Sequence, residues 1–174
     1  LFFLYKKKNI STYISTYISK NISKNISMDI STNISKGPHG PKGPGAPWGG
    51  WRLQESAPAG MLVVGIDNSP ARTDEYTHVE DIGDDGPMGG GGATYVAYVQ
   101  ETVRPFVRSE YGEPGPVGVM GSSLGGLISF YIAHLHPDDY AFAASLSGTM
   151  GWGRIGAESE TMIEAYAAAG HRAT

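Results

Sequence analysis

Short apolar runs and amphipathic stretches alternate along the chain from residue 61 onward. A continuous apolar run bounded by Pro, Gly or Asn is typical of a strand buried on both faces. Apolar positions at steps of three and four residues indicate a helix with one buried face. The predicted strands are Met61–Asp67, Val117–Met120 and Phe142–Ser147, and the predicted helices are Thr94–Ser109, Leu124–His134 and Glu158–Ala169. This alternation predicts an α/β fold, with a mostly parallel sheet flanked by helices on both faces.

Proline and glycine punctuate the predicted helices. Pro105 is expected to kink the last turn of the first helix, because proline lacks a backbone N–H and clashes with the preceding turn. Pro137 closes the second helix, and Gly170 stands where glycine commonly caps the end of a helix.

The first 36 residues follow a different pattern, in which Ile-Ser recurs every four residues. On a helix a period of four drifts by about 40° per repeat, so no fixed face is buried. We therefore expect residues 1–36 to be a low-complexity, disordered tail that packs little against the rest. The Gly/Pro-rich residues 37–50 predict a linker, which leaves residues 51–174 as a partial domain.

Composition and charge narrow the class of protein. With 174 residues and 40% hydrophobic content the chain suits one folded domain, and with no Cys it has no disulfide, thiolate zinc site or cysteine nucleophile. No apolar run reaches the roughly 18 residues of a membrane span, and Leu1–Tyr5 does not resemble a signal peptide. We expect no membrane partner; the compartment stays open, with the cytoplasm slightly favoured.

The net charge of -4 conceals a split, because residues 1–36 hold six Lys and one Asp. These lysines are spread thinly among Ile and Ser, so we expect no nucleic-acid partner. The chain begins with Leu rather than Met, which favours a fragment.

A Gly-x-Ser-x-Gly motif lies between the second predicted strand and its helix. It reads Gly121-Ser122-Ser123-Leu124-Gly125, and Gly126 follows. A serine on a strained strand-to-helix turn exposes its hydroxyl at the carboxyl edge of the sheet, and small neighbours let the backbone bend there. The backbone N–H of the next residue then lies at a helix N-terminus, where it can stabilise an oxyanion. The alternative is a Gly-rich turn with an incidental serine.

Four segments resemble the putative-esterase branch of the α/β-hydrolases, which includes esterase D, enterochelin esterases, feruloyl esterases and mycolyltransferases. They are residues 65–77, 89–107, 119–140 and 145–152. The resemblance implies a serine carboxylic-ester hydrolase without cofactor or metal that acts on a small ester. It implies Ser123 as the nucleophile, the Leu124 N–H as half of an oxyanion hole, and Gly121, Gly125 and Gly126 as the elbow around them.

The resemblance also suggests a role for Arg72, Glu75 and Tyr76, which match a segment that lines or braces the site in the family. We expect a bracing ion pair there, with substrate contact as the alternative.

The chain departs from the family in what it lacks. The family sheet has eight strands, and a third strand should separate Met61–Ile66 from Val117–Met120, yet the Gly/Pro linker stands in its place. We therefore expect a gap, a substitute segment near Trp51–Gln54, or a collapse of the two strands onto each other. The triad acid and histidine should follow the seventh and eighth strands, beyond Thr174. These departures predict a truncated domain that is nearly inactive.

The histidines of the chain do not complete the triad by position. His134 and His136 end one predicted helix and His171 follows another, so all three belong at the amino edge of the sheet. His78 lies in a loop at the carboxyl edge but precedes the nucleophile, so a surface-loop role is the main expectation and a base the alternative.

Residues 81–86 hint at a calcium loop, but Gly83 occupies a ligand position, which favours an acidic surface loop. Two other functions stay open beside ester hydrolysis. One is a non-catalytic remnant that binds acyl or glycosyl ligands, and the other is acyl transfer to a hydroxyl group. The oligomeric state is not determined by the sequence.

Overall fold

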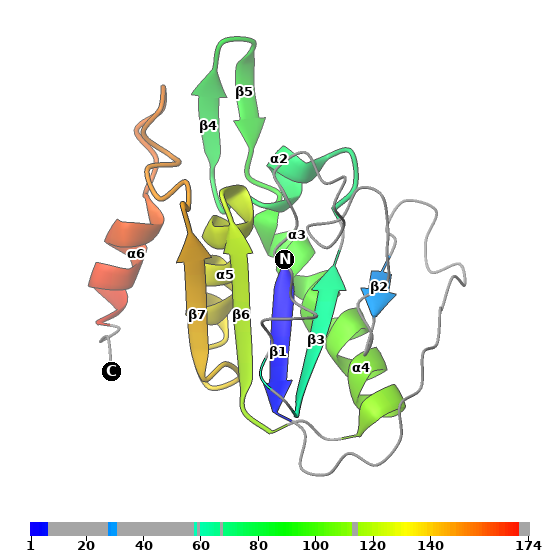
Figure 1. Cartoon of the computed structure of the whole chain (residues 1–174). Helices are drawn as coiled ribbons and strands as arrows, with labels where there is room; N and C mark the ends of the chain where they lie inside the picture. Colours follow the sequence, from blue (N-terminus) through cyan, green and yellow to red (C-terminus); the bar gives the residue numbers. More distant parts are fainter. Residues whose placement is uncertain (7–27, 31–57, 59, 67, 113–114, 171–174) are drawn as a thin grey trace.

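A five-stranded sheet and a separate two-stranded hairpin organise the computed structural model of the chain (Figure 1). The structure describes residues 1–6, 28–30, 58, 60–66, 68–112 and 115–170. The strands are β1 (Phe2–Lys6), β2 (Met28–Ile30), β3 (Met61–Ile66), β4 (Glu80–Gly83), β5 (Gly86–Gly89), β6 (Val117–Ser122) and β7 (Phe142–Leu146). The helices are α2 (Arg72–Glu75), α3 (Gly92–Tyr98), α4 (Arg104–Tyr111), α5 (Leu124–Leu135) and α6 (Met162–Ala169), with a π-helical segment at Val99–Val103.

The main sheet has the strand order β2-β3-β1-β6-β7. Among the strands of the described residues, only β6 and β7 pair in parallel, whereas β2 with β3, β3 with β1, and β1 with β6 pair antiparallel. The α/β class is thus confirmed, and the mostly parallel pairing is wrong. Strands β3 and β6 nevertheless run in the same direction, because each is antiparallel to β1, and β7 is parallel to β6. Their ends define a common carboxyl edge.

Strand β1 fills the place of the strand that the sequence lacks. Its backbone pairs with both neighbours, so that Phe3 lies opposite Val64 of β3 and Val119 of β6. The expectation that residues 1–36 pack little against the rest is therefore wrong for β1 and β2, which pair with the sheet. A strand between two others needs hydrogen-bond partners on both sides, and an antiparallel segment supplies them as well as a parallel one.

The rest of residues 1–36, the linker 37–50 and the proposed substitute Trp51–Gln54 lie outside the described residues. The division of the chain at residues 36 and 50 stays a prediction.

Helices α3 and α4 form one continuous path through the π-helical segment. Pro105 lies in the first turn of α4 rather than in a last helical turn. A proline in that position lacks an N–H that the preceding turn would otherwise accept, and the wider π-helical turn just before it accommodates the missing hydrogen bond. The predicted place of the kink is therefore wrong.

The core forms between the sheet and helices α3 to α5, which lie on the same face in Figure 1. For the described residues this differs from the expected cover on both faces. Val64 and Val119 of the sheet and Leu127, Ile128 and Ile132 of α5 are fully buried. Burial of each such side chain stabilises the fold by about 1.5–3 kcal/mol. None of the helices within the described ranges is long and apolar enough to cross a membrane.

Helix α6 starts later than predicted because of its N-cap. Thr161 and Glu164 form a capping box, in which the Thr161 hydroxyl accepts the Glu164 N–H and the Glu164 carboxylate accepts the Thr161 N–H at 2.8 Å. Gly170 ends the helix with φ 70°, as predicted for a glycine cap.

Candidate functional site

Ser123 connects β6 to α5 in a strained backbone conformation. Its φ is 56° and its ψ is -127°, and it is one of two non-glycine residues with positive φ in the described part of the chain, the other being Ser147. Such a conformation costs of order 1–3 kcal/mol and persists only where surrounding structure enforces it. Ser123 is also exposed. The structure thus places Ser123 at the predicted strand-to-helix turn, at the carboxyl edge.

Two of the three glycines around Ser123, Gly121 and Gly126, are required by close packing. A Cβ atom on Gly121 would overlap the carbonyl oxygen of Gly125, and one on Gly126 would overlap the Ser145 hydroxyl and lie 3.1 Å from the Gly121 oxygen. A Cβ on Gly125 would meet only the Tyr76 ring, at 3.9 Å. Gly121 and Gly126 therefore allow the start of α5 to lie directly against β6 and β7.

Backbone hydrogen bonds fix the turn and leave one N–H available. The Ser123 N–H donates to the Leu146 carbonyl of β7 at 3.0 Å, and the Ser123 carbonyl accepts from Gly126 and Leu127 at 2.9 and 3.2 Å. Among the hydrogen bonds of the described residues, none uses the Leu124 N–H. A helix N-terminus with an unused N–H beside an exposed hydroxyl favours an anion or a developing oxyanion.

The expected ion pair between Arg72 and Glu75 is absent from the described residues. The Arg72 guanidinium instead lies over the Tyr76 ring, 5.3 Å from its centroid. The Glu75 carboxylate accepts the backbone N–H of Ser69 at 3.0 Å. The Tyr76 ring is buried edge-on against Tyr95, with 5.0 Å between ring centroids. These residues brace the loop between β3 and α2, through a cation–π contact and a backbone bond rather than an ion pair.

His78 is held away from Ser123. Its Nε2 atom forms a hydrogen bond with the Glu160 carbonyl at 2.8 Å, and its ring lies 5.7 Å from that of Tyr131. Tyr131 is two helical turns beyond Leu124, about 10 Å along α5. Burial lowers the pKa of His78, although the hydrogen bond to Glu160 opposes this. The geometry disfavours His78 as the base for Ser123.

Asp81 differs from the acidic surface loop expected for residues 81–86, whereas Asp84 and Asp85 are exposed as expected. The Asp81 side chain is fully buried, and its carboxylate accepts backbone N–H groups rather than facing a cation. Within the described ranges, no group of three His, Asp or Glu side chains could hold a metal ion. Nothing local in the sequence signals this burial, because most of the donors lie more than 70 residues away along the chain.

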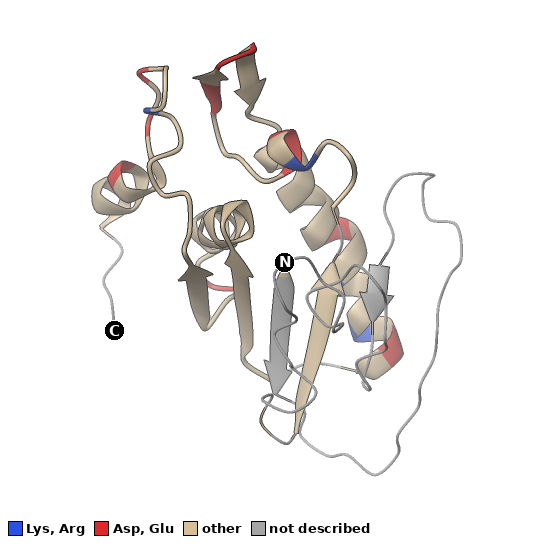
Figure 2. Ribbon diagram, turned by 45° about the horizontal axis from the view of Figure 1, so that its top comes forward, with Lys and Arg blue, Asp and Glu red and all other residues tan. Residues whose placement is uncertain are grey.

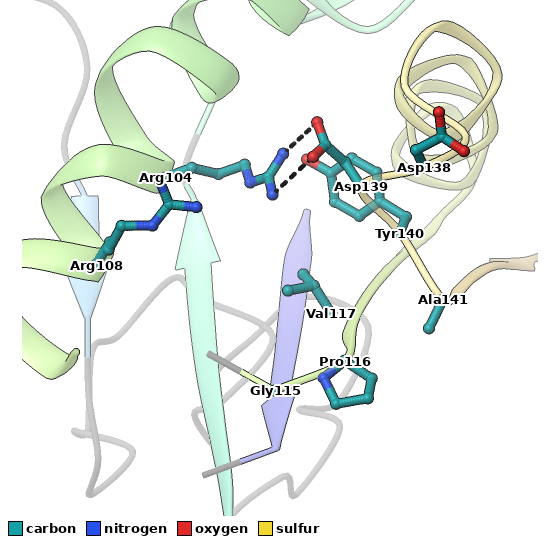
Figure 3. Close-up of a pocket in the computed structure, with 9 residues that line it drawn as sticks. All are labelled: Arg104, Arg108, Gly115, Pro116, Val117, Asp138, Asp139, Tyr140 and Ala141. Carbon is teal, nitrogen blue, oxygen red and sulfur yellow. Dashed lines mark hydrogen bonds and ion pairs between the residues drawn. The ribbon is translucent and has the colours of Figure 1, made fainter. Parts of the chain in front are cut away.

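A cavity of about 340 Å³ lies at the opposite, amino edge of the sheet (Figure 3). Its lining comprises Arg104, Arg108, Gly115, Pro116, Val117, Asp138, Asp139, Tyr140 and Ala141. The Arg104 guanidinium bonds the Asp139 carboxylate at 2.6 and 3.3 Å and lies 5.1 Å above the Tyr140 ring. The hydrogen bond from Arg104 lowers the pKa of Asp139. This network joins α4 to the turn before β7, far from Ser123.

Comparisons with known proteins identify the family. The search of curated protein sequences returned no match. Among solved structures, the crystal structure of the BES protein from Bacillus cereus is similar over 80% of this chain and 67% of that chain, with 15% sequence identity and a TM-score of 0.46. The family model described as Putative esterase matches residues 52–173. The chain therefore belongs to the putative esterase family.

Proposed function

We propose that the chain hydrolyses small carboxylic esters through an acyl-enzyme on Ser123. Family membership indicates ester hydrolysis in general, and the strained, exposed backbone of Ser123 is the observation that supports this residue as the nucleophile. In the first step the Ser123 Oγ attacks the ester carbonyl, the C–O bond to the alcohol breaks, and the alcohol leaves with a proton. In the second step water attacks the acyl-serine and releases the carboxylic acid.

The turn around Ser123 stabilises the tetrahedral intermediate in this proposal. The Leu124 N–H donates to the oxyanion, and a donor of this kind contributes about 3 kcal/mol to lowering the barrier. Gly121 and Gly126 let the helix start close enough to the strand for that N–H to reach the reacting carbonyl. The Ser123 N–H is already bonded to Leu146, so it is not a second donor.

We further propose that this 174-residue chain turns over slowly. A serine hydroxyl is a weak nucleophile at pH 7 unless a base accepts its proton. Of the histidines in the described ranges, His78 is held by Glu160, and His134 and His136 lie at the far end of α5. Loss of the base from a comparable triad costs about 10⁶-fold in kcat, and an oxyanion donor with substrate binding leaves at most about 10³–10⁴-fold over water.

The test is hydrolysis of p-nitrophenyl acetate and butyrate by the parent, Ser123→Ala and Ser122→Ala. Ser122 is the matched control, because it is an exposed serine one position earlier. We expect weak turnover that Ser123→Ala removes and that Ser122→Ala retains within about twofold. Mass spectrometry of the acetate reaction should place the acyl group on Ser123.

Turnover that is the same in Ser123→Ala and in the parent would refute the proposal. Binding of an ester without any acyl-serine would favour a non-catalytic remnant, and an ester product formed with an added alcohol would favour acyl transfer.

A further inference from the structure

Two segments far apart in sequence form a rim at the carboxyl edge. The first is residues 78–90, which contains the β4–β5 hairpin, and the second is the loop 147–161 that follows β7. Figure 1 shows both beyond the ends of β6 and β7, and Figure 2 shows acidic positions along each. The loop starts directly after Leu146, whose carbonyl accepts the Ser123 N–H, so the rim begins beside the candidate nucleophile.

The Asp81 carboxylate joins the two segments. It accepts five backbone N–H groups and is fully buried, so its charge is solvated by the backbone rather than by water. Oδ2 accepts from Gly153 at 2.6 Å and Ile155 at 3.0 Å, and Oδ1 accepts from Gly156 and Ala157 at 3.0 Å and Ile82 at 2.8 Å. Burial alone would raise the pKa of Asp81, but these N–H groups hold it well below its usual range.

Three further hydrogen bonds join residues 78–80 to the loop 147–161. Together with the bonds of Asp81 they form what we call the seam. The Trp152 indole N–H donates to the Val79 carbonyl at 2.8 Å, and the Ser159 hydroxyl donates to the Glu80 carbonyl at 3.0 Å. At the other end of the seam, His78 Nε2 forms a hydrogen bond with the Glu160 carbonyl at 2.8 Å. Consecutive residues from 78 to 81 therefore each bond the loop, which binds the hairpin segment and the loop into one unit.

We propose that Asp81 is a positioning residue that fixes the loop after β7 as a wall of the ester site beside Ser123. The inference rests on the proposed function, because the wall is defined by its place next to that serine. An ester bound at Ser123 contacts the first part of this loop, and the far part is held by Asp81. Loss of the Asp81 hydrogen bonds lets the loop 147–161 move away from the bound ester. This weakens substrate binding without changing the reacting groups.

The first test measures amide hydrogen exchange in Asp81→Asn, with Asp84→Asn as the control. Asp84 lies in the exposed turn of the same hairpin, so the charge change is matched. An amide side chain has one acceptor oxygen and presents an NH₂ group to the remaining donors. We expect protection of the Gly153, Ile155 and Gly156 amides to fall at least about tenfold in Asp81→Asn and to stay within about twofold in Asp84→Asn.

Amides of α5 should keep their protection in both variants. Unchanged protection in Asp81→Asn, or an equal loss in α5, would overturn the inference.

The second test separates binding from chemistry with p-nitrophenyl butyrate. Asp81→Asn should raise KM about tenfold and leave kcat within about twofold, and Asp84→Asn should change neither. If Asp81→Asn does not fold, Ser159→Ala removes one bond of the seam and should raise KM about twofold to threefold. Lost exchange protection with unchanged KM would overturn the positioning role. Failure of the proposed function is distinct, since it appears as Ser123-independent turnover in the parent, while exchange still reports on the seam.

Discussion

The two edges of the sheet differ in whether their polar groups are bound by other groups of the protein. At the carboxyl edge, Ser123 is exposed on a strained backbone and the Leu124 N–H is left unused by the described residues. At the amino edge, Arg104 is 13% exposed and bonds Asp139 while it lies over Tyr140. The first arrangement leaves donors and a hydroxyl for a ligand, and the second satisfies its charges internally.

A cavity alone therefore does not identify a functional site. The amino edge holds the cavity of about 340 Å³, but there the Arg104 guanidinium and the Asp139 carboxylate bind each other (Figure 3). The carboxyl edge carries the strain, which costs free energy and is retained in α/β enzymes where ligands bind at this edge of the strands. The strained edge is therefore where we propose that the chemistry takes place.

The largest expected effect comes from Gly121→Ala at the carboxyl edge. The new Cβ would overlap the backbone of Gly125, which cannot move without displacing the start of α5. We expect the free energy of unfolding to fall by about 3 kcal/mol, in the range of overpacked cores, and Ser123-dependent turnover to be lost. The control is Gly151→Ala, because a Cβ there has nothing within 4 Å.

Urea unfolding monitored by circular dichroism measures the first quantity, and the p-nitrophenyl acetate assay measures the second. Equal stability of the two variants would show that the turn has room for a side chain.

A smaller effect is expected from Arg104→Met at the amino edge. The variant loses charge-assisted bonds to Asp139 and the contact with the Tyr140 ring, so the free energy of unfolding should fall by about 2 kcal/mol. Arg154→Met is the control: its ion pairs with Glu158 and Glu164 are on the surface, and such pairs contribute about 0–1 kcal/mol.

Because Arg104 and its partners Asp139 and Tyr140 lie far from Ser123, Arg104→Met should leave Ser123-dependent turnover per folded molecule unchanged. If a fully folded Arg104→Met variant lost turnover, the two edges would not act independently of each other.

The carboxyl edge follows from the sequence more closely than does the strand that completes the sheet. The strand before Ser123 and the helix after it follow from local apolar runs between glycines, and their predicted bounds differ from the structure by at most two residues. The short apolar run Leu1–Tyr5 was the local signal for β1, but its partners lie more than 50 residues away along the chain, so nothing nearby indicated where it pairs. Its place in the sheet depends on long-range pairing, which no local pattern records.

The rim was missed for a related reason, although one signal was available. Asp84 and Asp85 form the two-residue turn between β4 and β5, and Gly86 follows with φ 108°, so this Asp-Asp-Gly sequence is a turn signal. The role of Asp81 had no such signal, because a buried carboxylate and an exposed one look alike in sequence. The expected ion pair between Arg72 and Glu75 does not form, because the residue types determine only which contacts are allowed. Side-chain packing decides which of these contacts forms.

The smallest expected effect is a difference in pH dependence between the two edges. Burial lowers the pKa of His78 in the fold, so below the unfolded value of 6.5 the unfolded chain binds the proton more readily and stability falls. The hydrogen bond from Arg104 lowers the pKa of Asp139, so its contribution is complete above 3.8 and is lost only at lower pH. Between pH 7.5 and 5.5 the stability advantage of the parent over His78→Gln should therefore shrink, while its advantage over Asp139→Asn stays constant. Urea midpoints of the three proteins at both pH values measure this, and equal pH slopes for the two differences would contradict the contrast between the edges.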